Sequence, residues 1–111
     1  MTKGEIIQDI FRFNKRFMPE ELTDEEKYQW MQKFIMYTTD ELMEVLEELP
    51  FKHWKDYSVV EVDDQKIIEE LADVLIFTFG MVDIMGFDDE DIFKEIAKKN
   101  RVNNVRQEEG Y

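Results

Sequence analysis

Two short stretches, Asp40-Glu41-Leu42-Met43-Glu44 and Glu69-Glu70-Leu71-Ala72-Asp73, decide the fold of this 111-residue chain. Each has two carboxylates three residues apart, Glu41 with Glu44 and Glu70 with Asp73, inside a segment whose apolar residues have helical spacing. Each pair therefore projects from one face of a helix. Antiparallel packing of the two helices would bring four hard oxygen donors together. Mg²⁺ prefers such donors and often binds substrate phosphates as well, so the pattern predicts a metal site for a phosphorylated small molecule.

Most paired acids on helices belong to solvated faces, and the surroundings of these two pairs decide against that interpretation. Leu42 and Val45 flank the first pair, and Leu71 and Val74 flank the second. Carboxylates beside core-facing residues need compensation, which a metal ion supplies efficiently. Other acids are interpreted as solvated or capping residues, namely Glu47, Glu48, Glu61 and residues 89–91.

Helix start and stop signals predict an all-α domain over residues 1–111, a four-to-five-helix antiparallel bundle. Thr23 and Glu26 form a capping box, and Gly86 is a helix stop. The helices are expected at roughly 5–17, 24–49, 64–85 and 89–100. Residues 51–62 are a connector in which Val59, Val60 and Val62 favour at most a short extended piece. Residues 101–111 are polar, lack an apolar period and are expected to form a tail.

Composition restricts the class of partner. The net charge of −13 argues against binding to nucleic acid or to an anionic membrane, and no apolar run approaches the ~20 residues that span a bilayer. The absence of Cys fits a cytoplasmic location. The two central helices are long and apolar on more than one side, so a monomer would leave apolar surface uncovered. A homodimer is therefore expected.

Three further features are candidates for ligand binding. Asn14 falls on the apolar side of the first helix, where it either bonds to a helix terminus or contacts the edge of a ligand. Trp54, in Phe51-Lys52-His53-Trp54-Lys55, either covers an edge of the core or stacks on a base. The tail combines cations with amides that suit phosphates and base edges, and the alternative is a frayed terminus.

Together these residues resemble a known family. The two carboxylate pairs resemble the all-α NTP pyrophosphatase superfamily. The 51–55 segment is similar to a connector of its dUTPase branch. Residues 99–111, with Lys99-Asn100, Asn103, Arg106-Gln107 and Gly110-Tyr111, resemble the C-terminal motif of the dimeric all-α dUTPases, phage members included. The chain departs from many of them at Phe11, where they have Gln.

The resemblance implies a role for each matching residue. Glu41, Glu44, Glu70 and Asp73 would bind Mg²⁺, for which Mn²⁺ is expected to substitute. Glu41 and Glu44 are the catalytic candidates, with Glu41 as first choice to accept a proton from water. Phosphate contacts are implied for Lys55, Lys99 and Arg106. A uracil pocket is implied for Asn14, Trp54 and Asn103, with Tyr111 bordering the nucleotide.

The implied reaction is hydrolysis of dUTP to dUMP and diphosphate, with dUDP also accepted. Two alternatives stay open: a dCTP/dUTP pyrophosphohydrolase of phage type, and a non-catalytic helical dimer that binds nucleotides or a protein.

Overall fold

The computed structural model describes residues 1–58 and 60–110, and within these ranges the chain is all-α and contains no strand, as predicted. The helices are α1 (Lys3–Lys15), α2 (Asp24–Glu47), α3 (Asp64–Ile84) and α4 (Asp89–Glu108). Val60 and Val62 lie in the irregular connector between α2 and α3, while Val59 and Tyr111 lie outside the described residues.

Local side-chain hydrogen bonds explain where the helices begin. Capping boxes open three of them, formed by Thr2 with Glu5, Thr23 with Glu26, and Asp88 with Asp91. Asp63 caps α3 by accepting a hydrogen bond from the Lys66 amide. After α3 the chain turns at Gly86, whose φ of 84° is the left-handed conformation that favours glycine. The predicted capping box and helix stop are thus confirmed.

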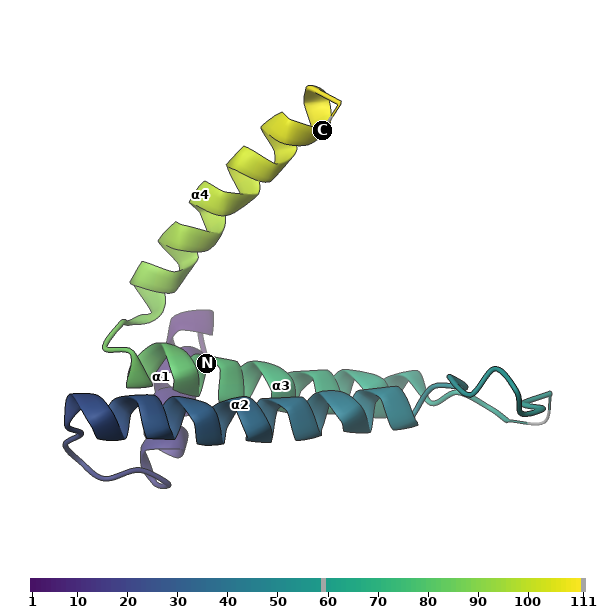
Figure 1. Cartoon of the computed structure of the whole chain (residues 1–111), viewed down its shortest axis with the longest axis horizontal. Coiled ribbons are helices and arrows are strands. Elements are labelled where there is room, and N and C mark those ends of the chain that lie inside the picture. Colours follow the sequence, from purple (N-terminus) through teal and green to yellow (C-terminus); the bar gives the residue numbers. More distant parts are fainter. Residues whose placement is uncertain (59, 111) are drawn as a thin grey trace.

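α2 and α3 form a long antiparallel pair, and α1 crosses it near the end that holds the C-terminus of α3 (Figure 1). The core lies at this crossing. Phe34 of α2 is fully buried, and Phe11 of α1 contacts Phe79 of α3 edge-on with ring centroids 6.3 Å apart. The opposite end of the pair leads into the connector of residues 48–63.

The expectation that the fourth helix ends near Asn100 is wrong, because α4 continues to Glu108. No Pro or Gly interrupts the chain between its capping box and Gly110, so local propensity sustains the helix without an apolar stripe. α4 contacts α3 near its start, where the rings of Phe79 and Phe93 lie 6.1 Å apart. Its second half stands clear of the α2–α3 pair (Figure 1).

The chain is more open than a compact monomer of its size. Its radius of gyration is 17.6 Å, against about 13 Å for a compact chain of this length. Its accessible surface is 8907 Å², against about 6,500 Å² for a compact protein of this mass. Several large apolar side chains are exposed on the central pair, including Ile35, Leu42, Ile68 and Leu75. Among the described residues, no helix is long and apolar enough to cross a membrane.

Candidate metal centre

The two carboxylate pairs face each other because α2 and α3 pack in matched layers. Phe34 lies against Gly80, and one step along, the rings of Tyr37 and Phe77 are 5.7 Å apart. Each step of three or four residues along α2 is met by an equal step back along α3. Such spacing is that of an antiparallel coiled coil, in which these positions form the seam between the helices.

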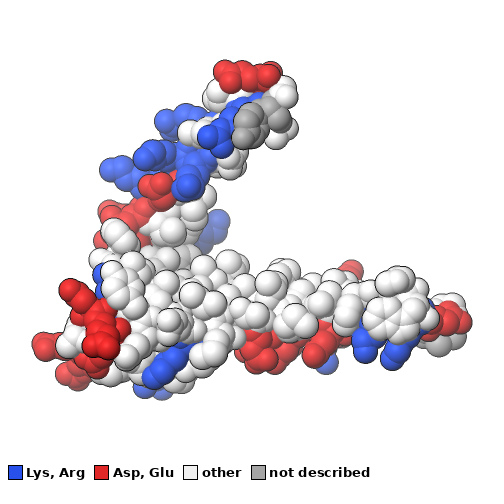
Figure 2. All heavy atoms as spheres, in the orientation of Figure 1, with Lys and Arg blue, Asp and Glu red and all other residues white. Residues whose placement is uncertain are grey.

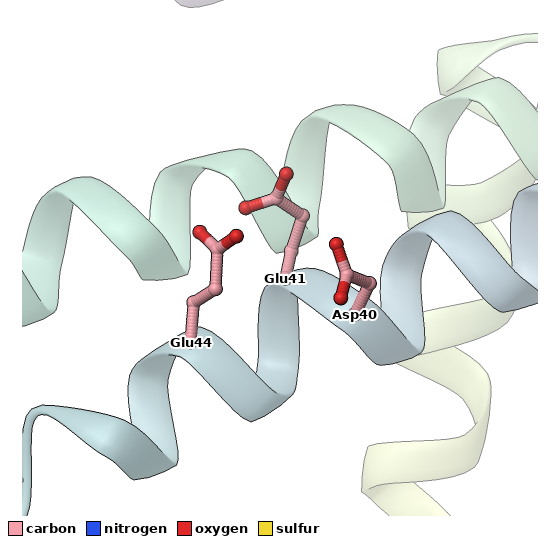
Figure 3. Close-up of side chains that lie close together, drawn as sticks. All are labelled: Asp40, Glu41 and Glu44. Atoms are coloured by element: carbon pink, nitrogen blue, oxygen red, sulfur yellow. The ribbon is translucent and has the colours of Figure 1, made fainter.

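The next layers of this seam are acidic. Continuing the same steps places Glu41 opposite Asp73, and then Glu44 opposite Glu70. Carboxylate oxygens of Glu41, Glu70 and Asp73 lie within 4.8 Å of one another, and so do those of Asp40, Glu41 and Glu44. Glu41 and Glu44 point from α2 toward α3, with Asp40 beside them (Figure 3). The structure thus brings together all four carboxylates that the sequence predicted to share a site.

Mutual repulsion and burial perturb the titration of this cluster. The pKa of Glu41 rises from 4.5 to about 7, chiefly because of burial, then because of the charges of Glu44 and Asp73. The pKa of Glu70 is also raised, first by a hydrogen bond with Glu44 and then by burial. These shifts mark a site where negative charge is concentrated between two helices.

The donor set fits a divalent cation. Glu41 Oε2 is buried and has no hydrogen-bond partner among the described residues. A buried carboxylate oxygen without a partner is costly, and coordination of a hard cation by several carboxylates removes that cost. Carboxylates from both helices are available, so Glu41, Glu44, Glu70 and Asp73 are placed to hold a divalent cation between α2 and α3.

Three residues at this site were missed by the sequence analysis. Asp40 joins the cluster. Glu48, interpreted as a solvated or capping acid, is the C-cap of α2, and it also pairs with Lys66 one layer beyond Glu44, with Oε1 and Nζ 3.3 Å apart. Lys66 is thus a cation next to the carboxylates, one turn before Glu70. Continuing the three- and four-residue spacing past Glu44 and back past Glu70 is the signal that would have found this pair.

Asn14 is fully buried at the crossing of α1 with α3. Its Nδ2 donates a hydrogen bond to the carbonyl oxygen of Ile76 at 2.8 Å, while Oδ1 has no partner among the described residues. Ile76 lies inside α3, so the expectation that Asn14 bonds to a helix terminus is wrong. The role in a uracil pocket stays a prediction.

The connector residues remain open to a ligand. Trp54 is 69% exposed, so it does not cover an edge of the core. Its ring contacts His53 edge-on, with centroids 5.2 Å apart. Lys55 is exposed as well. The connector leaves α2 at the end of the pair nearer the carboxylates, which is compatible with the predicted ligand contacts.

The predicted phosphate-binding residues of the C-terminal segment are not brought to the carboxylates within one chain. Lys99, Asn103 and Arg106 are exposed on α4, in the half that stands away from α2 and α3. Figure 2 shows basic residues gathered on α4 and acidic residues along the central pair. Tyr111, predicted to border the nucleotide, lies outside the described residues.

Similarity to a protein family agrees with this arrangement. No curated protein and no solved structure matches the chain. A family model does match, that of the MazG-like family, over residues 26–111. The matched region contains all of α3 and all but the first two residues of α2, and members are typically metal-dependent. The chain therefore belongs to the MazG-like family, within the all-α NTP pyrophosphatase superfamily, and this membership indicates a nucleotide pyrophosphohydrolase.

Proposed function

We propose that the protein is a Mg²⁺-dependent enzyme that hydrolyses dUTP to dUMP and diphosphate, and that it also accepts dUDP. The observation that carries the proposal is the acidic seam, where two helices oppose Glu41 with Asp73 and Glu44 with Glu70. Four mutually repelling carboxylates in a helix interface destabilise a fold without a cation. Metal-dependent hydrolysis of the phosphoanhydride bond of a nucleotide explains why these carboxylates lie together in the seam.

The groups at this site have separate proposed roles. A bound divalent ion supplies positive charge that stabilises the transferring phosphoryl group and makes water more acidic. We assign to Glu41 the role of accepting the proton from the attacking water, because Glu41 belongs to both carboxylate groups of the cluster and so lies at its centre, within reach of a water beside the metal. Lys66, next to the cluster, offers a further cation to the phosphates.

The preference for dUTP rests on the resemblance of residues 51–55 and 99–111 to the dimeric dUTPases. The exposed indole of Trp54 suits stacking on a base, and Lys55 is free to reach a phosphate. Hydrolysis of both dCTP and dUTP is the nearest alternative. Phe11, which stands where many dimeric dUTPases have Gln, supports this alternative. A non-catalytic nucleotide-binding dimer is the alternative from another class, against which the four intact carboxylates argue.

The enzyme is further proposed to act as a homodimer. The chain exposes about 2,400 Å² more surface than a compact monomer would. Obligate dimers bury areas of this order, roughly 1,000 to 2,500 Å² per subunit. Tyr28, Ile35 and Leu42 recur every seven residues along α2 and are all exposed, as are Ile68 and Leu75 on α3. A second copy that covers these side chains would remove apolar surface from water.

Dimerisation would also supply the missing cations. α4 is basic in its second half, whereas the central pair is acidic (Figure 2). Because α4 stands clear of its own central pair, we propose that α4 of one copy lies near the seam of the other. Lys99 and Arg106 would then contact phosphates, and Asn103 the base, in the partner's site.

A panel of nucleoside triphosphates, assayed for diphosphate release with Mg²⁺ and with EDTA, tests the function. The proposal requires the highest kcat/KM for dUTP and no turnover in EDTA. Equal kcat/KM for dCTP would establish the broader pyrophosphohydrolase. Nucleotide binding without turnover would establish the non-catalytic alternative.

A further inference from the structure

Three helices converge at Gly80, two turns along α3 from Asp73. A Cβ added to Gly80 would collide with the ring of Phe34 and lie 2.9 Å from Cγ of Asn14. The backbone of α3 is therefore packed directly against one side chain from α2 and one from α1. Any residue larger than glycine would separate the helices at this point.

Asn14 adds a directional contact to this junction. It is fully buried, and its Nδ2 donates to the Ile76 carbonyl at 2.8 Å. Ile76 lies one turn from Gly80 and three residues from Asp73. Oδ1 of Asn14 has no partner among the described residues, so Asn14 is costly to bury. An apolar residue of similar size would fill the space at lower cost, so simple packing does not account for Asn14.

The axial alignment of α3 against α2, their register, determines whether the carboxylates meet. The seam between α2 and α3 has aromatic layers at one end only, at Phe34 and Tyr37 with Phe77. The next two layers are carboxylates that repel one another. Beyond the junction at Gly80 and the aromatic layer next to it, apolar packing therefore adds little to specify the axial position of α3. In coiled coils, a single buried polar residue can fix register through a hydrogen bond that only one alignment allows, and Asn14 can act on α3 in the same way from α1.

We propose that Asn14 is a positioning residue: its hydrogen bond to Ile76 fixes α3 at the junction where Phe34 of α2 also packs, and thereby keeps α3 in register with α2 and the two carboxylate pairs aligned. The inference rests on the metal centre of the proposed function. A slip of one helix turn moves Asp73 by about 5.4 Å. The oxygens of the cluster lie within 4.8 Å of one another, so such a slip dismantles the site.

The experiment compares two variants whose side chains fill the site without a donor, Asn14→Leu and Asn14→Val. Thr78→Val is the matched control, because Thr78 Oγ1 donates to Val74 O at 2.7 Å, a bond of the same kind that lies within α3. Binding of Mn²⁺ is measured by calorimetry without nucleotide. Both Asn14 variants are expected to bind Mn²⁺ about 10-fold more weakly or worse, as loss of an orienting partner does. Thr78→Val should bind as the wild type does.

A second readout reports register without metal. The chain has no cysteine, so Glu48→Cys with Lys66→Cys can be joined by a short bis-maleimide across the last seam layer. Cross-linking should be fast with Asn14 present and slower in the Asn14→Leu background. Wild-type cross-linking together with wild-type Mn²⁺ affinity in the Asn14 variants would overturn the inference. So would unfolding of both variants, since Asn14 would then serve stability alone. Absence of Mn²⁺ binding by the wild-type protein would instead count against the proposed function, with cross-linking still deciding the register.

Discussion

Glu48 and Lys66 form an ion pair one layer beyond Glu44 and Glu70, with Oε1 and Nζ 3.3 Å apart. This ion pair is the layer next to the carboxylates at the connector end of the seam, and the aromatic layers lie next to them at the other end. Among the described residues of the α2–α3 seam, Lys66 supplies positive charge. The negative charge of Glu48 contributes to the raised pKa of Glu70. The layers thus place four carboxylates between an aromatic end and an ionic end of one helix pair.

Lys66→Met should affect substrate binding more than stability. The Lys66 side chain is 55% exposed, and pairs this exposed contribute at most about 1 kcal/mol to the free energy of unfolding. If Lys66 contacts a phosphate, the KM for dUTP should rise by about 10-fold, as loss of a charge-assisted hydrogen bond does. Urea unfolding and steady-state kinetics measure the two effects, with Lys3→Met as the control. An unchanged KM would show that Lys66 does not contact the substrate.

The metal-free protein should lose stability as the pH rises from about 4.5 to about 7. The pKa of Glu41 is raised to about 7 in the folded chain, so in this window the folded state holds a proton that the unfolded state releases. Glu41→Gln should flatten this dependence, and the raised pKa of Glu70 leaves a smaller slope of the same sign. Urea unfolding in EDTA across the window is the measurement. Stability that increases with pH, equally in both proteins, would contradict the assigned protonation of Glu41.

Features that depend on contacts within a few residues could be predicted from the sequence. Thr23 with Glu26 and Gly86 act through contacts within a few residues, so their helix boundaries could be predicted. The i, i+3 carboxylate pairs also encode a helix face, which is why the four-acid cluster was predicted. The end of α4 was not, because its helix depends on local propensity, and the apolar period used to find helices is absent there.

The remaining features arise between helices. Glu48 and Lys66 meet because of the register of α2 against α3, and neither has a local pattern that distinguishes it from a solvated residue. The bond from Asn14 to Ile76 depends on the crossing of α1 over α3 at Gly80. A carbonyl inside a helix carries no sequence signal as an acceptor, so a helix terminus was the natural but incorrect expectation.

A lysine on the exposed stripe should disrupt the dimer. Ile35→Lys or Leu75→Lys would bury a charge in an apolar interface, at a cost that exceeds the contribution of most single contacts. Light scattering should give twice the 13.5 kDa chain mass for the wild type and a monomer for these variants. Ile6→Lys, on the exposed side of α1, is the matched control. A monomeric wild type at micromolar concentration would refute the proposed assembly.

Subunit mixing tests whether α4 acts on the partner's site. Glu44→Gln removes a carboxylate from the seam, and Arg106→Ala removes a cation from α4. If the two groups serve one site from different chains, mixed dimers contain one intact site, and a 1:1 mixture should regain about a quarter of wild-type activity. Asn103→Ala in the same assay should reduce the preference for dUTP over dCTP. An inactive mixture would place Arg106 and Glu44 in the same chain's site.

Diphosphate release by carboxylate variants tests the central claim most directly. Glu44→Gln and Asp73→Asn each remove one charge from the seam, and Glu47→Gln removes the same charge from an exposed position on α2. With saturating Mg²⁺ and dUTP, the first two should lower kcat by about 10²-fold or more, as loss of a charge-stabilising group does. Glu47→Gln should retain wild-type turnover. Near wild-type rates in Glu44→Gln and Asp73→Asn, with correct folding, would contradict the assignment of the seam as the metal-dependent catalytic centre.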